Sequence, residues 1–204
     1  TLRRVNFSNS ENGILTSGKS GTILIEDSVF EGNGKAGRAH GMYVNAGHLI
    51  IRRSKIFSSK DEGHGIKSRA ERTIIEDSII ASLQGNDSRL IDVPNGGLVA
   101  IRRCLLVEGP ATVNWQLLSY GVEGMRHENN AMRVEGNVIV TDREGGSELI
   151  LVSEDAPRPI IQQNMVVGRI TYDWDNSNYF FDDRSELNFP PAPELPKWNP
   201  AGDK

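Results

Sequence analysis

Two short segments decide the fold of this 204-residue chain: LIEDSVF at residues 24–30 and IIEDSII at residues 74–80. Each has an apolar pair, an acidic pair, a serine and a second apolar stretch. Five further segments follow this plan, with a small polar residue in the place of the serine. The seven small polar residues are Asn6, Ser28, Ser54, Ser78, Cys104, Asn137 and Asn164. Their separations of 22, 26, 24, 26, 33 and 27 residues indicate a repeat protein.

A second series of short apolar segments alternates with the first, and turn residues separate the two series. No long segment has a helical period. The repeat is too short for a propeller blade, and the frame of a leucine-rich repeat is absent. The sequence therefore predicts an all-β fold, a parallel β-helix of about seven coils over residues 1–170. Equivalent residues of successive coils would stack about 4.8 Å apart. The second series reads NGILTS, HGMYVN, HGIKSR, RLIDVP, WQLLSY and ELILVS.

This coil length and the small polar corner residue resemble the right-handed parallel β-helix superfamily that includes the pectate lyases. The resemblance is weaker to its alginate and chondroitin lyases. It implies a right-handed solenoid with the seven small polar residues stacked in one corner ladder. It also implies a protein that acts on a polysaccharide and is secreted or periplasmic, although the chain shows no signal peptide. The fold alone leaves the activity open, because one fold hosts many functions.

Composition gives evidence on which classes of partner this chain can have. The net charge of −4 gives no sign of a nucleic-acid partner. No apolar run is long enough to cross a bilayer, so no membrane partner is expected. One cysteine excludes an intramolecular disulfide, and four histidines with one cysteine argue against a Cys/His metal cluster.

The outer face of the second series carries the candidate chemistry. Side chains alternate along a strand, so Lys67 and Arg69 are expected to face outward together. Tyr43 would lie one coil above Lys67, and Asp92 one coil below. Tyr120 is also expected to face outward, two coils below Arg69.

The coil between Cys104 and Asn137 is several residues longer than the others. The excess falls in residues 121–130, and such insertions on a rigid scaffold often carry function. We expect this loop to overhang the Lys67–Arg69 face. The side chains that it would bring there are Glu123, Arg126 and His127.

His40 and His64 occupy equivalent places in the segments RAHGMYVNA and EGHGIKSRA. Two interpretations stay open for them. They form a stacked pair that satisfies polar groups of the turns, or they line the groove and bind substrate together with Asp92.

For the lyases, the resemblance implies β-elimination on a uronate-containing glycan. That reaction neutralises a carboxylate, removes a proton beside it and protonates the leaving oxygen. Carried over, Lys67 would be the base and Arg69 the acid or the carboxylate clamp. Tyr43 or Tyr120 could stack on a sugar or serve as the base. Asp92 could orient Lys67 or help to hold Ca²⁺, the one cofactor considered, for which no ligand set is evident.

Two other interpretations of this face remain. Lys67 and Asp92 could form an ordinary exposed salt bridge of little energetic weight. The chain could also be a non-catalytic glycan-binding or structural module of a larger or oligomeric protein.

Charged pairs alternate in sign from coil to coil just before each corner, as Arg-Arg at 3–4, 52–53 and 102–103 and as Glu-Asp at 26–27 and 76–77. Stacking would put opposite charges side by side, which predicts a structural ladder that favours the correct register.

Both ends of the chain also carry expectations. The chain opens inside a coil, so a preceding segment or an oligomeric partner is expected to cover the first coil. Residues 171–204 are aromatic and Pro-rich and are expected to form a cap or a docking tail.

Overall fold

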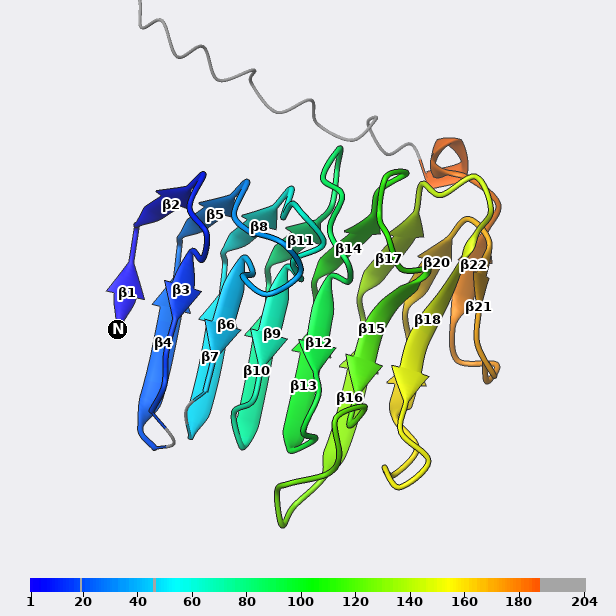
Figure 1. Ribbon diagram of the computed structural model, residues 1–204. Coiled ribbons are helices and arrows are strands. Elements are labelled where there is room, and N and C mark those ends of the chain that lie inside the picture. The colour runs from blue at the N-terminus through cyan, green and yellow to red at the C-terminus, as the bar shows by residue number, and fades with distance from the viewer. Residues whose placement is uncertain (19, 46, 188–204) are drawn as a thin grey trace, which may run out of the picture.

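The computed structural model describes residues 1–18, 20–45 and 47–187. It is an all-β solenoid in which each coil adds one strand to each of three parallel sheets (Figure 1). The first sheet has seven strands, and one turn of the chain leads from each strand to the next, so the solenoid makes about six turns. The predicted parallel β-solenoid is therefore confirmed. Among the described residues, the single helical segment is the short 3-10 turn η1 (Arg184–Leu187), and no helix is long and apolar enough to span a membrane.

The strands of the first sheet are β1 (Leu2–Arg3), β4 (Thr22–Glu26), β7 (His48–Arg52), β10 (Arg72–Glu76), β13 (Leu98–Arg102), β16 (Ala131–Glu135) and β19 (Ile160–Gln162). The second sheet contains β2 (Asn6–Ser8), β5 (Val29–Glu31), β8 (Lys55–Phe57), β11 (Ile79–Ala81), β14 (Leu105–Glu108), β17 (Val138–Thr141), β20 (Met165–Val167) and β22 (Tyr179–Phe181). The third contains β3 (Ile14–Leu15), β6 (Met42–Val44), β9 (Ile66–Ser68), β12 (Ile91–Val93), β15 (Gln116–Tyr120), β18 (Ser147–Val152) and β21 (Ile170–Thr171).

Small polar side chains form the corner between the first and second sheets. The backbone N–H of Ser54 donates to Ser78 Oγ at 3.1 Å, and that of Asn137 donates to Asn164 Oδ1 at 2.9 Å. Each such bond satisfies a buried backbone donor that the sharp corner removes from the sheet ladders. The ladder repeats from coil to coil because every coil has its corner at the equivalent position of the repeat.

The two ends of this corner ladder differ from the prediction. Asn6 pairs in register with Val29, one residue past the corner, so its assignment to the ladder is wrong. Val5 stands at the corner instead, and its N–H donates to Ser28 Oγ at 3.3 Å. At the other end the ladder continues to Asn178, whose Oδ1 accepts from the N–H of Asn164 at 3.1 Å.

Inward-facing side chains of all three sheets form one continuous core. In one coil, Ile51, Ile56 and Ile66 come from the three different sheets and are at most 1% exposed. The aliphatic alternation of the sequence is thus the core pattern of the solenoid. Burial of these rows is the main stabilising force in each coil.

The third sheet corrects one predicted register. Ile91 pairs with Leu118, not with Leu117, so Ser119 lies beside Asp92. The prediction that Tyr120 faces outward is therefore wrong. Its ring is fully buried in the core, and its hydroxyl donates to the carbonyl oxygen of Gly97 at 2.7 Å. Leu117 and Leu118 are adjacent and both buried, so the sequence was compatible with either of them as the partner of Ile91.

Strand pairing extends past residue 170. β21 joins the third sheet and β22 joins the second sheet (Figure 1). Trp174 packs against the core and meets Tyr172 and Phe180 edge to face at 5.4 and 5.3 Å. Residues 171–187 thus continue the strand pairing and pack against the core. The expected cap stays a prediction, and its remaining residues 188–204 lie outside the described residues.

The predicted charge ladder lies on the first sheet. Glu76 contacts Arg52 on one neighbouring strand at 3.0 Å and Arg102 on the other at 2.9 Å. Arg3 and Glu26 make the equivalent contact at 2.6 Å near the N-terminus. Opposite charges therefore alternate along the solenoid axis, as the sequence predicted.

Candidate functional site

Lys67 and Asp92 form a buried ion pair on the third sheet. Their strands, β9 and β12, are neighbours, and the two residues are partners in the parallel register. Lys67 Nζ lies 2.9 Å from Asp92 Oδ2. The residues are only 8% and 2% exposed, so the interpretation as an ordinary exposed salt bridge is wrong. Asp92 also accepts a hydrogen bond from Ser119 Oγ and lies 3.3 Å from His64 Nε2.

Arg69 lies beside this pair with all three of its nitrogens engaged. Nε donates to the hydroxyl of Tyr43 at 2.8 Å, Nη1 to Asn95 Oδ1 at 2.5 Å and Nη2 to Glu123 Oε2 at 2.5 Å. The guanidinium carbon is 5.6 Å from the centre of the Tyr43 ring. The side chain is thus held in one orientation by contacts to two neighbouring coils and one loop.

The inserted loop 121–130 does overhang this face. Glu123 bridges the two cations, with Oε1 2.8 Å from Lys67 Nζ and Oε2 2.5 Å from Arg69 Nη2. Its backbone N–H donates to the carbonyl oxygen of Pro94 at 2.9 Å. Asn95 Nδ2 holds the next carbonyl of the loop, that of Gly124, at 3.2 Å.

Two further loop residues that were expected at this face make no side-chain contact with it. Arg126 is exposed, and its backbone N–H donates a hydrogen bond to the carbonyl oxygen of Asn95 at 3.0 Å. His127 is half-buried, and its Nε2 is buried with no hydrogen-bond partner in the described part of the chain. The loop therefore presents Glu123 to the cations and turns the next polar side chains elsewhere.

The two histidines stack as one of the two interpretations expected. Their ring centres are 5.0 Å apart, and the backbone N–H of His64 donates to His40 Nδ1 at 3.0 Å. The ring of His40 also meets that of Tyr43 edge to face at 5.2 Å. Because His64 also faces Asp92, the stack closes one side of the cluster.

Burial keeps both imidazoles neutral. It lowers the pKa of His40 to about 3, with the charges of His64 and Lys67 acting in the same direction. It lowers the pKa of His64 to about 4, although the Asp92 carboxylate opposes this. At neutral pH the fixed charges of the cluster therefore come from its lysine, arginine and two carboxylates.

The four charged groups stabilise one another. Burial disfavours the Lys67 ammonium, but Asp92 and Glu123 outweigh it and raise the pKa of Lys67 above its ordinary value. Burial also acts against the Asp92 carboxylate, whose pKa is nevertheless lowered by His64, Lys67 and Ser119. The pKa of Glu123 is lowered in the same way, since hydrogen bonds from Lys67 and Arg69 outweigh its burial. All four groups are ionised at neutral pH.

We name these residues the cation cluster. It consists of His40, Tyr43, His64, Lys67, Arg69, Asp92, Asn95, Ser119 and Glu123. Sequence reasoning missed Ser119, because the register of β15 was set one residue off, and Asn95, because it lies in the turn after β12 where alternation no longer applies. The side chains come from four adjacent strands, their turns and one loop, so the cluster spans several coils.

A different polar region lies where the strands β14 and β17 of the second sheet end. Glu108 and Asp87 are each 1% exposed, and each has one buried oxygen without a hydrogen-bond partner among the described residues. Burial raises the pKa of both carboxyls to about 7. Glu108 accepts hydrogen bonds from the hydroxyls of Ser147 and Thr141. No ion pair of the described residues includes either acid, in contrast to the cation cluster.

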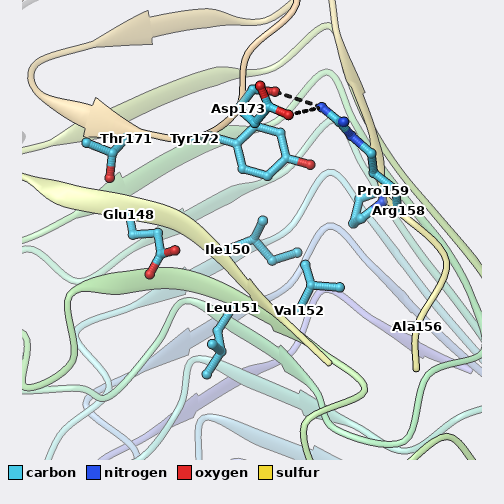
Figure 2. A pocket seen from close by; sticks show the side chains of 10 residues that line it. All are labelled: Glu148, Ile150, Leu151, Val152, Ala156, Arg158, Pro159, Thr171, Tyr172 and Asp173. Atoms are coloured by element: carbon cyan, nitrogen blue, oxygen red, sulfur yellow. Dashed lines mark hydrogen bonds and ion pairs between the residues drawn. The ribbon is translucent and has the colours of Figure 1, made fainter. Parts of the chain in front are cut away.

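A pocket of about 690 Å³ lies at the C-terminal end of the third sheet (Figure 2). Its wall includes Ile150 and Val152 of β18, and Figure 2 shows the Arg158–Asp173 ion pair beside the ring of Tyr172. None of the residues that line this pocket belongs to the cation cluster. This pocket is therefore distinct from the cation cluster.

The residues that the structure describes contain no group of three or more His, Cys, Asp or Glu side chains placed to hold a metal ion. The Ca²⁺ considered from the sequence stays a prediction, and the cationic side chains of the cluster are Lys67 and Arg69.

Comparison with protein-family models, with curated proteins and with solved structures finds no match for this chain. The fold is compatible with the β-helix superfamily, and the function has to be argued from the geometry of the site itself.

Proposed function

We propose that this chain binds a uronate-containing polysaccharide at the cation cluster and cleaves it by β-elimination, as a pectate-lyase-like protein. One observation carries the proposal. Lys67 lies in β9, a central strand of the third sheet, and Arg69 follows directly after this strand. Both direct their cationic groups to a single carboxylate, that of Glu123. A pair of cations that converges on a carboxylate is what the first step of the reaction requires.

The protonation states support a division of roles between the two cations and a separate base. Lys67 is held as an ammonium by Asp92 and Glu123, which raise its pKa, so it neutralises charge and the base has to be another group. This revises the role suggested by the resemblance. Arg69 presents a planar fork that suits a carboxylate, and Asn95 and Tyr43 fix its orientation.

Tyr43 is the residue that we propose to move the proton. Its hydroxyl lies 2.8 Å from Arg69 Nε, beside the position of a bound carboxylate. The Tyr43 oxygen takes the proton from C5 as the phenol passes its own proton to the leaving oxygen. The electron pair of the C5–H bond forms the C4–C5 double bond, the C4–O bond breaks and the phenol is regenerated, so the step is balanced without a co-reactant.

A non-catalytic module is the second candidate, and the saturation of the site favours it. Every cationic group of the cluster is already paired in the free protein, and Lys67 is only 8% exposed. In that case the face binds an acidic glycan, or it stabilises the loop, and forms no product.

The decisive experiment measures the ultraviolet absorbance of the unsaturated uronate product. The substrates are polygalacturonate, alginate, chondroitin and glucuronan, each with and without Ca²⁺. A lyase gives product on at least one substrate, and Lys67→Met and Arg69→Gln each lower the rate by about 100-fold or more. Lys55→Met is the matched control, because Lys55 is an exposed lysine of the second sheet.

Two results would contradict the lyase. One is the absence of product from every substrate. The other is product formation that survives in both Lys67→Met and Arg69→Gln. A secreted or periplasmic location belongs to the same proposal, since polysaccharides of this kind lie outside the cell, and fractionation of the source cells tests it.

A further inference from the structure

We propose that Glu123 is an internal stand-in for the carboxylate of the ligand. In the free protein it occupies the receptor formed by Lys67 and Arg69, and an acidic ligand enters by displacing Glu123 together with its loop. This inference rests on the proposed function for the class of ligand. It adds a competition inside the chain that controls access to the site.

The order of exposure supports displacement. The side chain of Glu123 is 42% exposed, whereas those of Arg69 and Lys67 are 18% and 11% exposed. A ligand that approaches from solvent therefore meets the Glu123 carboxylate before it reaches either cation. The deeper partner of Lys67, Asp92, is 2% exposed and belongs to a central strand of the sheet, so it stays in place.

The attachment of the loop also supports displacement. Glu123 lies outside the strands, between Gly121 and Gly124, whose φ angles of 76° and 91° suit glycine. The backbone contacts of Glu123, Gly124 and Arg126 go to the short turn at Pro94 and Asn95, whereas the two ends of the loop are bonded to Val93 and Gly97. Glu123 and its two neighbours in the chain can leave this turn without breaking any strand pairing of the third sheet.

Packing at the base of the loop marks the hinge. Met125 lies against Gly96 and Gly121, where an added Cβ atom would come within 2.5 Å of its side chain. Met125 is half-buried and packs against the main core. A flexible thioether side chain anchors the loop while the segment before it is free to swing.

Charge balance defines the ligand that can replace Glu123. Two cations, Lys67 and Arg69, face two carboxylates, Asp92 and Glu123, and both histidines are neutral. Withdrawal of Glu123 leaves one uncompensated positive charge in a largely buried site, which is costly. A ligand carboxylate restores the balance, whereas a neutral or esterified sugar does not.

The test compares Glu123→Gln with Glu128→Gln, an exposed acid on the same loop. The measurement is the dissociation constant of trigalacturonate, by calorimetry at fixed ionic strength. Gln keeps the shape of the side chain and loses its charge, so Glu123→Gln is expected to bind about 10-fold tighter or more, while Glu128→Gln binds like the unaltered chain. The fully methyl-esterified trimer is expected to bind weakly to all three.

A second measurement uses the unaltered chain. On saturation with trigalacturonate, backbone amides of the loop 121–130 are expected to exchange faster with deuterium, because the bond from the Glu123 N–H to Pro94 opens. Unchanged or slower exchange in the loop, or equal or weaker binding by Glu123→Gln, would overturn the displacement.

The outcomes separate this inference from the lyase. Tighter binding by Glu123→Gln without unsaturated product from any variant supports the displacement and contradicts β-elimination. Product formation by the unaltered chain, with no gain in affinity in Glu123→Gln, supports the lyase and contradicts the displacement.

Discussion

Two regions of this solenoid stack opposite charges on adjacent strands, yet they do so in different surroundings. On the first sheet, Arg52, Glu76 and Arg102 form a ladder in which the arginine side chains are 40% and 42% exposed. On the third sheet, the side chains of Lys67 and Asp92 are 11% and 3% exposed. The pairing geometry is the same, and the nitrogen–oxygen distances are near 3 Å in both.

This difference shows that burial, more than the pairing distance, determines how much an ion pair contributes to stability. An exposed pair gains little, because water screens it and two long side chains lose freedom. A buried pair has lost its hydration, so removal of one partner leaves the other without compensation. The overhanging loop with Glu123 supplies part of the cover on the third sheet.

The largest predicted effect is the loss of the buried cation. Lys67→Met leaves Asp92 uncompensated, and we expect the free energy of unfolding to fall by about 3 to 5 kcal/mol in urea denaturation. The double variant Lys67→Met/Asp92→Asn should regain part of this loss, because the stranded charge is gone. A loss below about 1 kcal/mol would place the buried pair in the same class as the exposed ladder.

Glu108 sharpens the comparison, because it is a buried carboxyl without a paired cation. Burial raises the pKa of Glu108 from 4.5 to about 7, so the folded chain keeps a proton that the unfolded chain loses. Its contribution to stability is therefore lost as the pH rises from about 4.5 to 7. At pH 8, Glu108→Gln should be more stable than the unaltered chain by about 2 to 3 kcal/mol, with little difference at pH 4.5.

Thermal unfolding at both pH values measures this effect. Glu135→Gln is the matched control, because Glu135 is a less buried glutamate on β16. Equal behaviour of Glu108→Gln at both pH values would show that Glu108 is ionised in the folded chain over the whole range.

His64 gives the opposite pH dependence within the cation cluster. Burial lowers the pKa of His64 from 6.5 to about 4, so between these values the unfolded chain binds a proton that the folded chain does not. Stability should therefore fall by about 2 to 3 kcal/mol from this group as the pH falls through that range. His64→Gln should remove this part of the slope in denaturation series, and His48→Gln, at an exposed histidine of β7, should retain it.

The smallest predicted effect lies on the first sheet. Glu76→Gln should cost about 1 kcal/mol or less, because its arginine partners are half-solvated, and the loss should shrink in concentrated salt. The penalty of Lys67→Met should persist in the same salt. Denaturation at low and high salt compares the two, and equal salt sensitivity would remove the distinction between the regions.

The fold could be predicted because its rules repeat. Each coil repeats one corner residue and two apolar segments, so the repeat itself predicts the fold. Strand register was predicted wrongly where the local pattern was ambiguous. The pair Leu117–Leu118 fits either phase, and the wrong choice turned Tyr120 outward. In the first coil, Val5 stands at the corner in place of a small polar residue. The sequence pattern placed the neighbouring Asn6 at the corner instead, because Asn6 is small and polar.

The site was predictable in part, for a related reason. Alternation placed Lys67 beside Asp92, and the extra length of one coil pointed to the loop that holds Glu123. Burial of these charges could not be predicted, since it depends on the path of a loop without a repeat. Asn95 was missed for the same reason, because it lies in a turn.

The stacking of coils has one more consequence, in the matching of lengths. Neighbouring strands lie about 4.8 Å apart, which is close to the advance of one hexose along an extended polysaccharide. In a glycan bound parallel to the solenoid axis, each successive sugar would therefore contact the next strand. Each strand would then contact one sugar of the bound glycan. Insertion of one whole coil beside β9 would shift the recognised position by one sugar, and the strand count of the third sheet would act as a molecular ruler.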